Sequence, residues 1–115
     1  MIRVREGWTA SYDPALAVRA GETLEVGRRD DEWPGWAWCV ARGLGGWLPL
    51  EIVGDGHALG DFDTREMTVA EGDLVEPGEG RAGWTWCRAG GREGWVPDRC
   101  LDLAEEVVRA RAGPT

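Results

Sequence analysis

Apolar and polar positions alternate along short runs of this chain, and the pattern predicts an all-β protein. The runs are bounded by Gly, Pro, Asp and Glu and recur at a spacing of about ten residues. No stretch before residue 101 keeps a helical apolar period over three turns. The expected strands are 1–4, 23–26, 35–42, 45–49 and 52–53, followed by 56–59, 73–76, 83–89, 93–97 and 101–103.

The two halves of the chain repeat one pattern. Gly-Trp-x-Trp-Cys followed by Gly-Trp-x-Pro occupies 35–39 and 46–49, and it recurs 48 positions later at 83–87 and 94–97. Self-similarity at a fixed offset indicates one small fold built twice. We therefore predict two domains, 1–54 and 55–115, joined at the short glycine-rich junction 54–56. Acids early and arginines late in 101–111 favour a short helix leading into a tail at 104–115, with a frayed tail as the alternative.

Strand parity separates a core face from a more open face. Residues i and i+2 of a strand share a face, so Trp36, Trp38 and Val40 point one way. The position matching Val40 is Arg88 in the second copy, which favours a partly open tryptophan face. The opposite, core-facing side is expected to hold Ala37, Cys39, Ala41, Thr85, Cys87 and Ala89, with Leu48 and Val96 from the following strands.

Charge and chemistry exclude several classes of function. The net charge is −8, from 21 acidic and 13 basic side chains, which disfavours nucleic acids and anionic membranes as partners. No run of about 18 apolar residues is present, and residues 2–6 do not resemble a signal peptide, so we expect a cytoplasmic protein. His57 and the cysteines (Cys39, Cys87 and Cys100) have no catalytic or zinc-binding spacing. We expect no enzymatic activity, no metal and no cofactor.

The repeated residues resemble a tandem pair of bacterial variant Src-homology-3 (SH3) domains. In that family an acidic-aromatic element opens the domain, to which Tyr12-Asp13 and Phe62-Asp63 are similar. An apolar-x-x-Gly-acid turn follows, matched by 18–22 and 69–73, and then a tryptophan opens the third strand, matched by Trp36 and Trp84. The resemblance covers nearly the whole chain and implies two five-stranded SH3-like barrels.

The same resemblance implies a protein-interaction module. SH3 domains dock proline-rich segments in the polyproline II conformation across aromatic slots. The candidate ligand-binding residues are Tyr12, Trp36, Trp47 and Pro49 in the first copy and Phe62, Trp84, Trp95 and Pro97 in the second. Three acids, Asp30, Asp31 and Glu32, precede Trp36 and are suited to a basic ligand side chain.

We therefore expect an adaptor that binds a protein or peptide of unknown identity, as a monomer or weak homodimer. Two alternatives stay open. One is a structural or homo-oligomerising role, with the aromatic faces buried between domains or copies. The other is recognition of a small ligand or a cell-wall peptide, as in some bacterial relatives of this fold.

Overall fold

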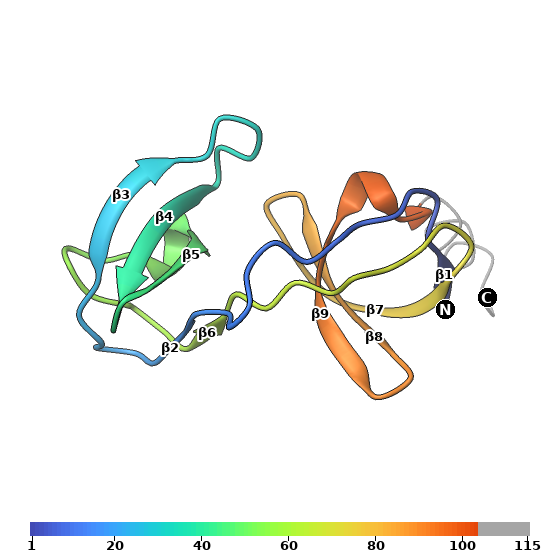
Figure 1. Cartoon of the computed structure of the whole chain (residues 1–115). Coiled ribbons are helices and arrows are strands. Elements are labelled where there is room, and N and C mark those ends of the chain that lie inside the picture. The colour runs from blue at the N-terminus through green and yellow to red at the C-terminus, as the bar shows by residue number, and fades with distance from the viewer. Residues whose placement is uncertain (104–115) are drawn as a thin grey trace, which may run out of the picture. The chain divides into compact units, whose positions relative to one another are not determined.

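The computed structural model describes residues 1–103 and is mostly β, as the alternating pattern predicts. The strands form three antiparallel sheets, ordered β1-β7-β8-β9, β2-β6 and β3-β4-β5 (Figure 1). Within the described residues these sheets do not join into a closed barrel. The elements are β1 (Ile2–Arg3), β2 (Ala17–Val18), β3 (Glu25–Arg29), β4 (Trp36–Ala41), β5 (Leu44–Pro49), the 3₁₀ turn η1 (Leu50–Ile52), β6 (Phe62–Asp63), β7 (Leu74–Arg81), β8 (Trp84–Ala89), β9 (Arg92–Pro97) and the 3₁₀ turn η2 (Asp98–Cys100). The tail expected at 104–115, and all but the first three residues of the short helix expected within 101–111, lie outside the described residues.

The chain divides into two compact units. One unit is Ser11–Arg65, and the other combines Met1–Ala10 with the described residues from Glu66 to 103. The division expected from the sequence, at 54/55, separates the two copies of the repeat. In the structure the first ten residues instead fold with the second copy, and residues 55–65 fold with the first. We call Ser11–Arg65 the central unit and the other the split unit.

A three-stranded meander is the common element of both units. In the central unit β4 pairs with β5 around the turn Arg42-Gly43, and in the split unit β8 pairs with β9 around Gly90-Gly91. All four turn residues have positive φ, as the two-residue type I′ turn requires. This turn sets the register, in which Trp38 lies opposite Trp47. A proline precedes the 3₁₀ turn that ends each meander.

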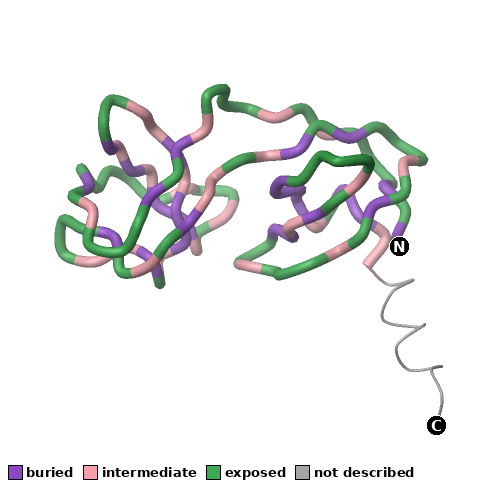
Figure 2. Tube along the Cα trace, turned by 90° about the horizontal axis from the view of Figure 1, so that it is seen from below, coloured by how far each residue is buried: buried purple, intermediate pink, exposed green. Residues whose placement is uncertain are grey.

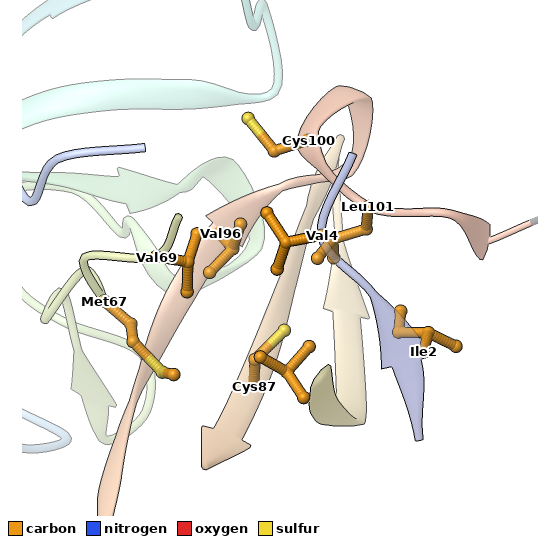
Figure 3. Packing of buried hydrophobic residues seen from close by; sticks show 9 residues of the cluster. Ile2, Val4, Met67, Val69, Cys87, Val96, Cys100 and Leu101 are labelled. Atoms are coloured by element: carbon orange, nitrogen blue, oxygen red, sulfur yellow. The ribbon is translucent and has the colours of Figure 1, made fainter. Parts of the chain in front are cut away.

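The N-terminal strand forms part of the core of the split unit. β1 pairs with β7 in the register Ile2↔Val75. The side chains of Ile2 and Val4 are fully buried, and each contributes about 1.5–3 kcal/mol by its burial. They belong to the cluster of buried residues shown in Figure 3, which comprises Ile2, Val4, Met67, Val69, Val75, Cys87, Val96, Cys100 and Leu101.

Equivalent segments complete the two units, and each comes from the other copy of the repeat. In the central unit the backbone of Ala58 hydrogen-bonds to the turn 21–22 at 2.7 and 2.8 Å. In the split unit the backbone of Val4 hydrogen-bonds to the matching turn 72–73, both at 2.8 Å. Val4 and Ala58 therefore occupy equivalent places. We call 3–8 and 57–62 the opening segments, and their placement is the reason that the units differ from the repeats.

The glycine of the Gly-Trp-x-Pro pattern is required by close packing. A Cβ added to Gly94 would lie 2.7 Å from the carbonyl carbon of Glu66 and 2.8 Å from the nitrogen of Met67. A Cβ on the equivalent Gly46 would lie 3.0 Å from Oγ1 of Thr64. The meander is thus crossed at this glycine by the chain that enters or leaves the unit.

The predicted core face is confirmed at most positions. Figure 2 shows buried residues interspersed with exposed ones along the chain, although β3 is exposed throughout and β9 is buried from Gly94 to Pro97. Seven of the eight residues expected to point inward are buried, while Ala89 is partly exposed; the buried ones are Ala37, Cys39, Ala41, Leu48, Thr85, Cys87 and Val96.

Candidate functional site

In each unit, two tryptophans lie opposite each other on the last two strands of the meander. Trp38 and Trp47 are direct cross-strand partners whose ring centroids lie 5.2 Å apart at 71°. Trp86 and Trp95 form the equivalent pair at 5.3 Å and 79°. Such edge-to-face pairs add about 0.5–1.5 kcal/mol beyond the area they bury. The pairs follow from the repeated sequence together with the two-residue turn.

In the central unit this pair extends into a partly exposed row of rings. Tyr12, which is 39% exposed, lies against Trp38 with centroids 5.3 Å apart. Trp38 and Trp47 are both partly exposed. The guanidinium carbon of Arg28 lies 5.2 Å from the centroid of the Trp47 ring. We call Tyr12, Trp38 and Trp47 the aromatic strip.

The Trp38 ring packs over Gly45 of the neighbouring strand β5, where there is no side chain. A Cβ on Gly45 would lie 2.2 Å from Cζ2 of Trp38, so only glycine leaves room for the indole. The matching position in the split unit is Glu93, whose carboxylate forms an ion pair with Arg88 at 3.3 Å. The two units therefore present different surfaces despite their shared repeat.

The tryptophans that open β4 and β8 are more buried than the parity argument suggests. Trp36 is 4% exposed, lies opposite Pro49 and contacts the Phe62 ring at 5.9 Å. Both Pro49 and Phe62 are buried. The structure therefore brings together three predicted site residues, but it places Phe62 with the first copy rather than the second.

The split unit repeats this arrangement with a different aromatic residue. Trp84 lies opposite the buried Pro97 and contacts Trp8 at 5.3 Å and 85°. The indole nitrogen of Trp8 donates a hydrogen bond of 3.0 Å to Glu66, and the guanidinium of Arg99 lies 5.7 Å from the Trp8 ring centroid. Trp8 therefore occupies the place that Phe62 takes in the central unit.

Buried tryptophans leave less exposed aromatic surface on the split unit. Trp95 is 4% exposed, whereas its partner Trp86 is partly exposed. Trp95 and Pro97 were both expected to contact a ligand, and in the structure both pack inside the protein. The central unit is consequently the better candidate for a binding surface.

In the acidic loop between β3 and β4, Asp30 has a structural role. Oδ1 of Asp30 accepts hydrogen bonds from the backbone nitrogens of Glu32 at 2.7 Å and Trp33 at 3.0 Å. This carboxylate stabilises the turn, as aspartates commonly do in loops. Asp31 and Glu32 are exposed. These two residues are therefore the better candidates for contact with a basic ligand.

A shallow depression of about 480 Å³ lies beside the turn Arg42-Gly43 between β4 and β5. Two of its lining residues, Glu22 and Arg42, form an ion pair, and Arg42 also donates to the carbonyl of Ala17 at 2.7 Å. Because Glu22 and Arg42 bond to each other and Arg42 bonds to the backbone, the depression is better explained as support for the turn than as a site.

The three thiols are buried. Burial raises the pKa of Cys39, Cys87 and Cys100, and that of Cys87 reaches about 12 with a contribution from the nearby Asp98 carboxylate. Such thiols are poor nucleophiles at neutral pH. Among the described residues, no group of three or more His, Cys, Asp or Glu side chains is placed to hold a metal ion.

Sequence reasoning did not select Trp38, Arg28 or Trp8 as site residues. The pairing of Trp38 with Trp47 could have been predicted from the sequence, since a two-residue turn at 42–43 places the two residues opposite each other. The roles of Arg28 and Trp8 depend on contacts between segments distant in sequence, for which the chain carries no local signal.

Comparison with protein-family models, curated proteins and solved structures finds no match for this chain. In the part of the chain that the structure describes, no helix is long and apolar enough to cross a membrane.

Proposed function

We propose that the protein is a noncatalytic interaction module whose aromatic strip binds an extended peptide segment with proline or basic side chains. The main support for this proposal is the row formed by Tyr12, Trp38 and Trp47, in which partly exposed rings lie side by side. Aromatic rings of this kind offer large contact area at little entropic cost, and they suit the preformed polyproline II conformation.

An SH3-like architecture for both units is part of this proposal. Each unit contains a meander followed by a proline and a single 3₁₀ turn, in the order that the sequence resemblance implies. In each unit an opening segment pairs beside the matched turn at 21–22 or 72–73. These shared features support two small barrel-like domains related by duplication.

The charges around the aromatic strip favour a basic ligand. Glu25 is exposed and lies opposite Val40, which shares a strand face with Trp38. At the first residue of β4, the acidic loop lies beside the strand, because Asp30 donates its backbone N–H to the carbonyl of Trp36 at 2.9 Å. Arg28 already places a cation over Trp47, so the attraction for a basic side chain comes from these acids and not from this ring. A basic ligand side chain would compete with Arg28 there.

Peptide titration of matched variants tests this function. The probe is a proline-rich peptide containing arginine, with an acidic peptide of equal length as its control. We expect the arginine peptide to shift the indole NMR signals of Trp38 and Trp47. Trp38→Ala should weaken binding about thirty-fold or more, because aromatic hot spots contribute about 2 kcal/mol or more.

Trp86→Ala is the matched control, since Trp86 holds the equivalent position in the split unit. We expect it to leave peptide affinity unchanged. Equal losses in Trp38→Ala and Trp86→Ala would show that the aromatic strip is not the binding surface. A peptide series that moves no indole signal would contradict the proposed function itself.

A structural role is the second candidate, favoured by the burial of Trp36, Trp84 and Trp95 together with both prolines of the repeat. Its test is Trp36→Ala, measured by thermal unfolding. Under a purely structural role the variant melts much lower, and no peptide binds the wild-type protein.

A further inference from the structure

The first ten residues are tied to the split unit by an extensive set of noncovalent contacts. In addition to those of Val4, backbone hydrogen bonds join the opening segment 3–8 to the unit: Arg5 N and Glu6 N donate to Cys100 O at 2.7 and 3.3 Å, Asp102 N donates to Arg3 O at 2.9 Å, and Trp8 and Val69 form a reciprocal pair, both at 2.9 Å. Ile2 and Val4 are in its core (Figure 3), and the Trp8 ring packs on Trp84. The split unit is incomplete without this segment.

Along the chain, however, the segment is separated from these contacts by the whole central unit. The backbone leaves at Ala10, forms the unit Ser11–Arg65, and returns at Glu66. The segment and the surface that accepts it are thus connected only through another folded body. Their pairing within one chain depends on an effective concentration of about millimolar order, as for other tethered partners.

The equivalent acceptor in the central unit is already occupied. There the opening segment 57–62 makes the same contacts, with Leu59 N donating to Ile52 O at 2.7 Å and Gly54 N donating to His57 O at 2.8 Å. Phe62 fills the place beside Trp36. The acceptor that remains for residues 1–10 is therefore the second copy of the repeat, in the same chain or in another.

We propose that Met1–Ala10 also docks on the split unit of a second copy of this chain, so that two copies associate by reciprocal exchange of this segment. Exchange preserves every contact that the segment makes, including the hydrogen bond from Trp8 to Glu66, and alters only the chain connection. Reciprocal exchange of identical elements gives a closed two-fold dimer at low energetic cost.

Disulfide trapping in the full chain separates exchange from other association. Arg3 and Leu74 are exposed Cα partners across β1 and β7, so the variant Arg3→Cys/Leu74→Cys reports where residues 1–10 dock. The control is His57→Cys/Thr23→Cys, because these exposed partners occupy the equivalent pairing within the contiguous central unit. The native thiols are buried and do not compete in the oxidation.

Each variant is unfolded, refolded in reductant at concentrations from about 10 µM to about 1 mM, then oxidised and analysed on nonreducing gels. We expect the Arg3/Leu74 disulfide to change from intrachain to interchain as the refolding concentration rises. The His57/Thr23 disulfide should stay intrachain throughout. Wild-type protein refolded at the highest concentration should contain a dimer that persists on dilution, seen by native mass spectrometry.

Three results would overturn the proposal. The first is an Arg3/Leu74 disulfide that stays intrachain at every concentration, with no wild-type dimer. The second is interchain disulfide formed equally by both variants, since that shows nonspecific association. The third is efficient intrachain trapping of Arg3→Cys/Thr23→Cys, since the segment would then complete the central unit instead.

Discussion

Replacing Gly94 by alanine tests whether the split unit is packed as the structure shows. The added Cβ would meet the carbonyl carbon of Glu66 at 2.7 Å and the nitrogen of Met67 at 2.8 Å. Ordinary carbon contacts lie at about 3.5–4.0 Å, so an atom must move by close to an ångström. Both neighbours are backbone atoms and cannot rotate away, so the whole crossing segment must shift.

The expected cost combines overpacking with a weakened hydrogen bond. Overpacking of a close contact costs about 1–3 kcal/mol. The displaced segment also carries the hydrogen bond from Met67 N to Trp95 O, now 3.1 Å, which contributes about 0.5–1.5 kcal/mol. We expect Gly94→Ala to lower the free energy of unfolding by about 2–4 kcal/mol, a large part of the stability of a small unit.

Urea unfolding followed by tryptophan fluorescence measures this change, with two matched glycines as controls. Gly46→Ala should cost less, about 1 kcal/mol, because the closest atom there is the side-chain oxygen Oγ1 of Thr64 at 3.0 Å. Gly80→Ala should be nearly neutral, since its Cβ would meet nothing closer than 3.8 Å. If Gly94→Ala proves as stable as Gly80→Ala, the close crossing at Glu66 does not exist.

Two further predictions concern individual side chains. Because burial and Asp98 raise the pKa of Cys87 to about 12, the unfolded thiol ionises before the folded one. Its contribution to stability is therefore complete below about pH 9 and is lost toward about pH 12, at up to about 1.4 kcal/mol per pH unit. Urea unfolding of Cys87→Ala should show a shallower decline over this range, and parallel curves would refute the assignment. Asp30→Ala should cost about 1 kcal/mol and speed amide hydrogen exchange at Glu32 and Trp33, because it removes their shared acceptor. Asp31→Ala should leave both exchange rates unchanged, and equal effects of the two substitutions would contradict the role of Asp30.

The duplication, the β class and most of the core face are properties of the local sequence. The offset of 48 between the two Gly-Trp-x-Trp-Cys segments is visible without coordinates. Alternation along a strand determines that Cys39 and Cys87 point inward, because successive side chains lie on opposite faces. The short turns determine the register of the hairpins, and with it the pairing of Trp38 with Trp47.

Which opening segment completes which unit was decided only by the tertiary structure. Each segment has a small apolar residue followed four positions later by an aromatic one, Val4 and Trp8 or Ala58 and Phe62, and each accepting turn, 21–22 or 72–73, is a glycine followed by an acid. The sequence therefore supports either assignment. Backbone hydrogen bonds between segments carry no mark of their partner in the local sequence. The contacts of Trp36 with Phe62, and of Trp84 with Trp8, follow from this long-range choice. These contacts explain why strand parity predicted Trp36 and Trp84 to be more exposed than they are. Parity tells which residues share a face of the sheet, but not which other segments cover that face.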